Sequence, residues 1–290
     1  MRILVFGAGG QVGHALARLR APGVEIAAVA RAEADLTDAD AVRRAVERHR
    51  PDIVVNAAAY TAVDRAEDEP EAAFAVNCDG AWHVAQACAA LDRPLIHIST
   101  DYVFDGAKPA PYAESDPVRP LNVYGSSKLA GERAVAETLE RHVTLRTSWV
   151  FGSHGGNFVK TMLRLGAQRP ELGIVADQIG CPTGAEDIAV AAVSVARRVA
   201  AGQGSWGVHH FSGGEAVSWF GFAEAIFAGW SGLSGRPGPR LRPIGTADYP
   251  VRARRPANSR LDCSLIAERY GIDAANWRAT LARTLARLHE

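Results

Sequence analysis

A tyrosine and a lysine, Tyr124 and Lys128, stand four residues apart in the segment VYGSSK. On a helix this spacing places both side chains on one face. A phenol has a pKa near ~10, too high for ready proton exchange at neutral pH, and a nearby ammonium group favours the phenolate. Such a tyrosine can give a proton to a carbonyl oxygen while a hydride arrives from a nicotinamide, and the lysine can also bind the nicotinamide ribose.

Lysine is rare in this chain, which singles out Lys128 further. Only three of the 32 lysines and arginines are lysines, namely Lys108, Lys128 and Lys160. Because the chain uses arginine for nearly every cation, a retained lysine is a candidate for chemistry that a guanidinium group cannot perform.

Thr100 ends the strand expected over PLIHIST and opens the polar run TDY. Its hydroxyl group can hydrogen-bond the same carbonyl oxygen that Tyr124 protonates. Thr100, Tyr124 and Lys128 then form a catalytic triad that polarises a ketone, donates the proton and tunes the donor. The alternative is that Thr100 only caps the strand end.

Three glycines, Gly7, Gly10 and Gly13, occupy the turn between an expected strand at residues 2–6 and an expected helix at 11–19. Glycine there permits a tight turn and close approach of a pyrophosphate to the helix N-terminus. The Gly-x-x-Gly-x-x-Gly spacing differs from the Gly-x-Gly-x-x-Gly of standard dehydrogenases. An ordinary strand–helix turn is the alternative to a dinucleotide site.

Arg31 follows the second expected strand, where an NAD-binding chain usually carries an acid for the ribose 2′-hydroxyl. A cation at this place favours a 2′-phosphate, so we expect NADPH as the cofactor. Glu33 and Asp35 lie close enough to leave NADH open. A solvated surface arginine is the alternative role for Arg31.

Short apolar runs alternate with helical patterns through the first half of the chain. The expected strands are residues 2–6, 25–30, 52–59, 94–100 and 143–151, and the expected helices are residues 11–19, 38–49, 71–91 and 126–139. This alternation predicts an α/β fold with a doubly wound, Rossmann-like parallel sheet covered by helices on both faces. Such sheets bind ligands at the carboxyl ends of their strands.

The alternation weakens after Gly152, which suggests a second, smaller part of the molecule. We expect residues 1–150, with about 185–215 returning to the sheet, to form a dinucleotide-binding domain. Residues from about 151–184 and 216–290 are then expected to form a C-terminal substrate-binding part.

The composition is ordinary for a globular protein, with 48% hydrophobic residues, 22% charged residues and no net charge. Bulk charge therefore favours neither nucleic acid nor a membrane as partner. No apolar run of ~20 residues is present, and the first strand begins too early for a signal peptide. The four cysteines are scattered without zinc-like spacing, so we expect reduced thiols and a cytoplasmic protein.

These features together resemble the extended short-chain dehydrogenase/reductase superfamily, and within it the chain looks closely like the dTDP-4-dehydrorhamnose reductases. The resemblance implies NAD(P)H-dependent reduction of the C4 ketone of dTDP-4-dehydro-6-deoxy-L-mannose to dTDP-L-rhamnose, a polysaccharide precursor. The segments that carry it are FGAGGQVG, DIVVNAAAYTAVDRAE, VNCDG, HISTDYVFDG, PLNVYGSSKLAGE, LRTSWVFG, NFVKTMLRL, DQIGCPTGAEDIA and RRPANSRLD, between residues 6 and 262.

The resemblance also implies a set of binding residues. Those implied for the cofactor are Gly7, Gly10, Gln11, Val12 and Gly13 at the pyrophosphate, Asp35 and Leu36 at the adenine, Ala59, Tyr60 and Thr61 toward the nicotinamide, and Tyr124 and Lys128 at the reaction centre. Those implied for the dTDP-sugar are Thr100, Asp101 and Tyr102 at the sugar, Trp149 against the deoxysugar, and Asn157, Arg255 and Asn258 toward the nucleotide.

The residues themselves add to two of these implied roles. Residues 236–260 contain seven arginines and one acid, so this segment should attract a diphosphate, although a solvated loop is the alternative. A flat aromatic ring at Trp149 suits the apolar face of a sugar, and core packing is the alternative.

The first helix departs from the family in one respect. Some relatives are reported to bind a metal at a dimer interface through acids, one of them on this helix, but here it reads His14-Ala15-Leu16. Glu186 alone is a candidate ligand. We therefore expect no metal, or at most one at a dimer interface. The sequence does not decide whether the protein forms a homodimer.

Three other functions compete with reduction of this sugar. A nucleotide-sugar 4,6-dehydratase usually reads Thr-Asp-Glu, whereas this chain has Tyr102 at the third position. Another nucleotide-sugar reductase or an epimerase of the superfamily stays open. The third alternative is a non-catalytic regulatory subunit on the same fold. Such a subunit does not need Thr100, Tyr124 and Lys128, so their presence argues against it without excluding it.

Overall fold

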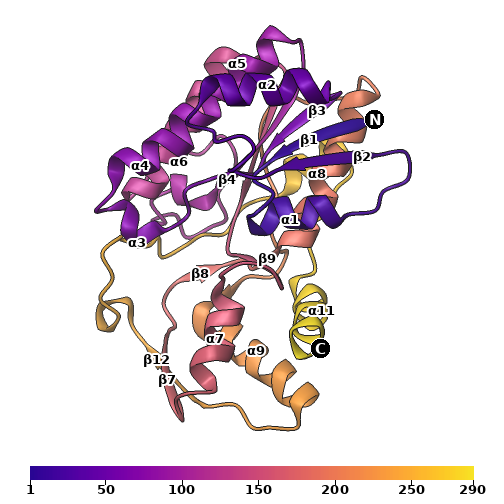
Figure 1. The fold of residues 1–290 in the computed structure, drawn as a ribbon. Coiled ribbons are helices and arrows are strands. Elements are labelled where there is room, and N and C mark those ends of the chain that lie inside the picture. Colours follow the sequence, from indigo (N-terminus) through magenta and orange to yellow (C-terminus); the bar gives the residue numbers. More distant parts are fainter.

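A six-stranded parallel sheet forms the centre of the protein in the computed structural model, which describes residues 1–290 (Figure 1). All five strand pairs are parallel, and the central strands are buried on both faces. The predicted doubly wound α/β fold is confirmed. In spatial order the strands are β10 (Gly207–His210), β5 (His142–Thr147), β4 (Leu95–Thr100), β3 (Ile53–Asn56), β1 (Arg2–Phe6) and β2 (Glu25–Val29).

Helices cover the two faces of the sheet with separate hydrophobic cores. One face packs against α1 (Gln11–Arg18), α8 (Ala185–Ala200) and α10 (Ser264–Tyr270). The other packs against α2 (Ala39–His49), α5 (Gly80–Ala90) and α6 (Val123–Thr138). Since α8 and β10 come from the second half of the chain, residues 185–210 complete the sheet begun by the first half (Figure 1).

The direction of winding reverses between β1 and β3. From β1 the chain passes to β2 on one side and then returns to β3 on the other. In open α/β sheets the carboxyl ends of the strands at such a point border the crevice that holds a ligand. This crevice lies beside the glycine turn that follows β1.

A smaller part lies beyond the carboxyl ends of the strands and has its own aromatic core (Figure 1). Its helices are α7 (Phe158–Gly166), α9 (Trp219–Ser234) and α11 (Trp277–His289), packed around the strand pair β7 (Glu171–Val175) and β12 (Arg240–Ile244). Two short strand pairs adjoin it, β6 (Val150–Phe151) with β9 (Thr183–Gly184) and β8 (Ile179–Gly180) with β11 (Val217–Ser218).

Two helices differ from the sequence-based expectation. Helix α6 begins at Val123 because the Asn122 side chain accepts a hydrogen bond from the Gly125 amide at 2.7 Å, and Tyr124 therefore lies in its first turn. The expected helix at 71–91 is α4 (Pro70–Phe74) and α5 joined by a π-helical turn at Ala75–Asp79.

The remaining elements are α3 (Val63–Ala66) and the 3-10 turns Asp101–Val103 and Thr246–Asp248. No helix has the length and apolar composition needed to cross a bilayer.

Candidate functional site

Tyr124 lies on α6 beside the end of β4, where the sequence analysis expected it. Its pKa is raised by burial, and a hydrogen bond with the Thr100 side chain acts in the opposite direction. The ring of Tyr102 meets it edge-on, with 5.7 Å between the ring centroids. Glycine is required at the next position, since a Cβ at Gly125 would lie 2.2 Å from the Tyr102 carbonyl oxygen. The tyrosine is thus held against the polar residues that end β4.

Lys128 is fully buried one helical turn further along α6. Its ammonium group donates a hydrogen bond to the carbonyl oxygen of Ile98 at 2.8 Å. Burial lowers the lysine pKa from 10.5 to about 8, and the charge of Glu132 opposes that shift. Tyr124 and Lys128 share one helix face, as predicted, and the lysine nitrogen is hydrogen-bonded to strand β4.

The expected lowering of the Tyr124 pKa by Lys128 is wrong. The tyrosine pKa is raised, because burial penalises the phenolate and the lysine is bonded to the Ile98 carbonyl. Tyr124 is therefore a neutral phenol at physiological pH, with its proton available for donation.

Thr100 and Asp101 form the polar end of β4. The Thr100 hydroxyl donates to Asp101 Oδ1 at 3.0 Å and accepts from the Tyr102 amide at 3.2 Å. Burial raises the Asp101 pKa from 3.8 to about 6, against hydrogen bonds from the Ser259 and Thr100 side chains that lower it, and no hydrogen bond of normal geometry reaches its Oδ2 atom. A buried acceptor without a partner is a group that a substrate hydroxyl can satisfy.

Tyr102 and Arg255, implied by the resemblance for the sugar and the nucleotide, lie close to each other beside this centre. The Arg255 guanidinium carbon lies 5.9 Å from the Tyr102 ring centroid, and the same side chain bonds to Asp64 Oδ2 at 2.7 Å. Burial raises the Tyr102 pKa to about 12, which keeps its hydroxyl neutral. These contacts attach the Arg255 segment to α3 and to the 3-10 turn after β4.

Trp149 adopts a positive φ of 47°, which is uncommon for a residue with a side chain. Its ring stacks on Trp219 at 3.4 Å between centroids. A Cβ at Gly180 would lie 2.3 Å from the same ring, so glycine is required beneath it. Packing against neighbours, the alternative left open by the sequence, therefore accounts for much of this ring's surface.

The glycine turn after β1 has the form of a pyrophosphate cradle. Gly7 has φ of +93°, and its Cβ would lie 2.6 Å from the Ala58 nitrogen, while a Cβ at Gly13 would lie 2.0 Å from the Gly7 oxygen. Gly10 begins α1 without a side-chain cap, and the first turn contains no acid. Free amides at an uncapped helix N-terminus suit an anion. These residues fit a dinucleotide pyrophosphate; Val12, also expected here, is buried in the core.

Gln11 and Asn157 bond to each other, which the sequence did not predict. The Asn157 amide donates to Gln11 Oε1 at 2.9 Å and to the Gly152 oxygen at 2.7 Å, while its own oxygen caps α7. Gln11 Nε2 donates to the Val150 oxygen at 3.4 Å. Both amides therefore join the glycine turn to the smaller part of the protein.

Arg31 lies at the end of β2 with 80% of its side chain exposed. Its Nε bonds to Asp35 Oδ2 at 2.9 Å, and Asp35 also accepts bonds from the Thr37 amide and hydroxyl. The Thr37 amide bond and Arg31 hold the Asp35 pKa below its ordinary value. Leu36 is buried in the core next to α5.

Asn77 is a functional candidate that the sequence analysis missed. It lies in the π-helical turn, and its side chain accepts from the Tyr60 amide at 2.8 Å and donates to the Tyr60 oxygen at 3.0 Å and to Ser127 Oγ at 2.9 Å. It thereby holds the loop Ala59-Tyr60-Thr61 against α6. The signal was the asparagine in VNCDG, whose local role depends on a π turn that periodicity does not reveal.

Asn258 does not point to a ligand site, because its amide group donates to the oxygens of Lys108 and Ala110 and accepts from Arg260. In the basic segment around it, residues 236–260, fewer arginines are unpaired than the composition suggests. Four of its seven arginines pair with acids outside the segment, namely Arg240, Arg242, Arg252 and Arg255. Its attraction for a diphosphate is therefore weaker than the sequence predicts.

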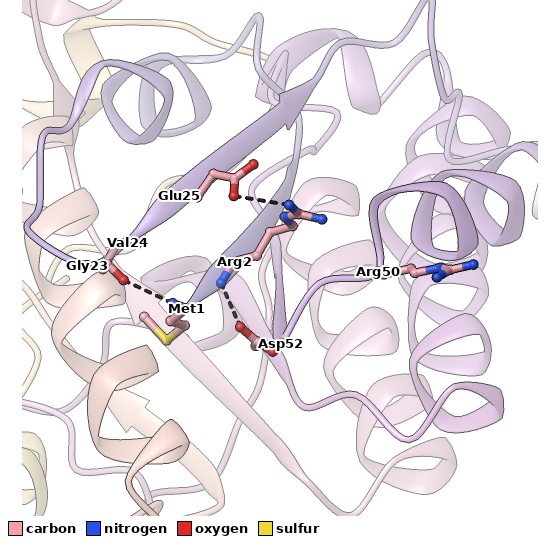
Figure 2. Close-up of a pocket in the computed structure, with 7 residues that line it drawn as sticks. All are labelled: Met1, Arg2, Gly23, Val24, Glu25, Arg50 and Asp52. Carbon is pink, nitrogen blue, oxygen red and sulfur yellow. Dashed lines mark hydrogen bonds and ion pairs between the residues drawn. The ribbon is translucent and has the colours of Figure 1, made fainter.

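Of two surface hollows, one lies away from these residues and the other is lined in part by Gln11 and Gly152. Figure 2 shows one of about 570 Å³ at the amino ends of β1 and β2, lined by Met1, Arg2, Glu25 and Asp52 among others. Because α/β sheets bind ligands at the opposite edge, it does not bear on the site. The second, of about 540 Å³, lies between α1, α8 and α11. No cluster of three His, Cys, Asp or Glu side chains has the arrangement of a metal site.

Comparisons with known proteins agree with this arrangement. The family model described as RmlD substrate binding domain matches residues 1–290. The dTDP-4-dehydrorhamnose reductase of Sinorhizobium fredii is 48% identical over 285 residues, which cover 98% of this chain and 96% of that protein.

Solved structures give the same result. The crystal structure of dTDP-4-dehydrorhamnose reductase from Bacillus anthracis in complex with NADP matches with a TM-score of 0.91 and 35% identity over 99% of both chains. UDP-glucose 4-epimerase from Brucella ovis in complex with NAD shares the fold, with a TM-score of 0.83 and 20% identity over 99% of this chain and 98% of that one. The chain belongs to the dTDP-4-dehydrorhamnose reductase family.

Proposed function

We propose that the protein reduces the C4 ketone of dTDP-4-dehydro-6-deoxy-L-mannose to dTDP-L-rhamnose with NADPH. The observation that carries this proposal is the meeting of Tyr124 with Thr100 at the carboxyl end of β4, on the edge of the sheet that also bears the glycine cradle. A proton donor and a dinucleotide site at one edge are what ketone reduction requires.

The chain's own residues supply the proton and hold the ketone. Tyr124 donates its phenolic proton to the C4 oxygen, and the Thr100 hydroxyl turns from Asp101 Oδ1 to donate a hydrogen bond to the same C4 oxygen as charge develops there. The Lys128 ammonium group donates to the Ile98 oxygen and keeps two further N–H donors for the nicotinamide ribose. Asp101 Oδ2, which lacks a partner, accepts a bond from a sugar hydroxyl. The nicotinamide, when bound, supplies the hydride.

The cofactor preference follows from the end of β2. Both oxygens of Asp35 are already bonded, to Arg31 and Thr37, so Asp35 is poorly placed to receive a ribose 2′-hydroxyl, and Glu33 accepts a bond from the Ala30 amide through Oε1. The remaining nitrogens of Arg31 are exposed and can bind a 2′-phosphate. The Bacillus anthracis relative, solved with NADP, supports the same choice.

We assign the two parts of the molecule accordingly. Residues 1–150 with about 185–215 bind the dinucleotide, and about 151–184 with 216–290 bind the dTDP-sugar. The aromatic core of the smaller part and the approach of Arg255 to Tyr102 support this division. A homodimer and a cytoplasmic location stay predictions from the sequence.

The test is an absorbance assay of NADPH oxidation by the purified protein with dTDP-4-dehydrorhamnose. We expect oxidation that depends on the sugar and a product that co-elutes with dTDP-L-rhamnose. Oxidation with a different dTDP-4-keto sugar alone would assign another reductase. No oxidation with any such sugar would overturn the proposal and favour a non-catalytic subunit on this fold.

A further inference from the structure

Glu132 forms a buried ion pair that the reaction, as described above, does not use. Arg146 donates to both of its oxygens, through Nε at 2.9 Å to Oε1 and through Nη2 at 2.6 Å to Oε2. Both side chains are only 4% exposed. Ser99 Oγ donates to Glu132 Oε1 at 2.5 Å. A buried ion pair of this kind is weak evidence for a contribution to stability, which points to a specific role for Glu132.

The partners of Glu132 come from two adjacent strands. Ser99 of β4 and Arg146 of β5 are directly paired in the sheet register and bond to the same carboxylate from below α6. The helix is therefore fixed against both strands at one point. The Arg146 guanidinium also lies over the Phe104 ring, 5.1 Å from its centroid, which limits its movement.

Three successive turns of α6 meet three successive residues of β4. Tyr124 meets Thr100, Lys128 donates to the Ile98 oxygen, and Glu132 accepts from Ser99. Tyr124, Lys128 and Glu132 are spaced four residues apart and share a helix face. A shift of the helix at Glu132 would displace the other two groups together.

We propose that Glu132, held by Arg146 and Ser99, is a positioning residue that fixes the Tyr124–Lys128 face of α6 against β4 and keeps the Lys128 ammonium group charged. The proposal rests on the proposed function only for its effect on catalysis. Glu132 lies one turn beyond Lys128 on the same face of α6, and its charge raises the lysine pKa that burial lowers.

Glu132 is the charged group that acts on the Lys128 pKa, and other titratable groups lie on the same helix and on strands β4 and β5. Tyr124 on α6 and Asp101 after β4 lie at the reaction end, and Arg146 on β5 lies behind Glu132. His97 on β4 is fully buried, and burial, followed by the Lys128 charge, holds its pKa well below the ordinary value, so it stays neutral. Glu132 is therefore the group whose removal changes the charge near Lys128 while leaving the reacting groups intact.

The test exploits the presence of only three lysines in the chain. In the free protein labelled with 13Cε-lysine, three signals are expected, and Lys128→Arg assigns one of them. We expect Glu132→Gln to lower the titration midpoint of Lys128 by about one pH unit or more. The alkaline limb of kcat/KM should move by the same amount, and kcat should fall at least about tenfold, with the NADPH dissociation constant within about twofold.

Two further variants keep the test decisive. Ser99→Ala removes one bond and retains the ion pair, so it should shift the midpoint in the same direction by less, and it serves if Glu132→Gln does not fold. Glu215→Gln is the matched control, because Glu215 forms an exposed two-bond pair with Arg278 at 2.7 Å, far from α6. It should leave the Lys128 midpoint and kcat unchanged.

An unchanged Lys128 midpoint and alkaline limb in folded Glu132→Gln would overturn the inference and leave Glu132 a purely structural residue. The NMR titration does not depend on turnover. If the wild-type protein fails to reduce the ketone, the proposed function is lost while the midpoint shift still reports the coupling.

Discussion

The interface of α6 with β4 and the end of β2 each carry an arginine–carboxylate pair, in opposite environments. Arg146 and Glu132 are 4% exposed with several further partners, whereas 80% of the Arg31 side chain is exposed beside Asp35. A buried pair cannot exchange partners without a large desolvation cost, whereas an exposed pair exchanges readily. The first region therefore fixes geometry for the reaction, and the second can select a ligand.

Tyr124→Phe should have the largest effect in the buried region. It removes the proton donor while keeping the ring that contacts Tyr102. We expect kcat to fall at least ~100-fold, the scale of general acid catalysis, with NADPH binding retained. Steady-state kinetics with a fluorescence titration of NADPH measures both quantities. A near wild-type rate would remove Tyr124 from its assigned role.

Thr100→Val should have the next largest effect on kcat. It keeps the shape of the side chain but removes the hydroxyl that Asp101 Oδ1 and the Tyr102 amide contact. We expect kcat to fall roughly 10- to 100-fold through loss of one donor to the developing oxyanion. A change confined to the thermal midpoint, with kcat intact, would show that Thr100 only caps the strand, and Thr100→Ser, which keeps the hydroxyl, should then leave the midpoint close to that of the wild type.

Arg31→Ala should have a smaller effect, confined to the exposed region. Loss of a charge-assisted bond to a phosphate is worth ~1.5–3 kcal/mol, so NADPH should bind about tenfold or more weakly. NADH should be little affected, and kcat at saturating cofactor should be unchanged. Equal weakening of NADPH and NADH binding, measured by fluorescence titration, would contradict the role of Arg31. It would also show that the exposed pair does not select between the cofactors.

The pH dependence should reflect Lys128. Its pKa in the folded protein is about 8, so kcat/KM should fall as the pH rises through that value and the ammonium loses its proton. Because the unfolded chain keeps a lysine pKa near 10.5, it binds more protons between these values, and stability from this group increases with pH over that window. A pH–rate profile with no alkaline limb in this range would contradict the assignment.

The parts of the site with a local signature could be predicted from the sequence. The glycine turn and the Tyr-x-x-x-Lys pair depend on a strand, a turn and one helix, so spacing alone places them. Asn157 and Asn258 could not be placed, because their amides are used by contacts with chain segments distant in sequence. The charge of residues 236–260 was overestimated because Asp64, Asp68 and Glu171, which neutralise it, lie outside the segment.

The sign of the Tyr124 pKa shift also could not be predicted from spacing. It depends on whether burial or the lysine charge dominates, and Lys128 directs its ammonium group to the Ile98 oxygen. The Glu132 contacts likewise require the register of β4 against β5, which the sequence pattern does not specify.

Transfer of deuterium from NADPH labelled at nicotinamide C4 tests the central claim most directly. After turnover with dTDP-4-dehydrorhamnose, we predict a dTDP-L-rhamnose product one mass unit heavier, with the deuterium located at sugar C4 by NMR. A product without deuterium at C4, or labelled cofactor that is not consumed, would contradict hydride reduction of that ketone.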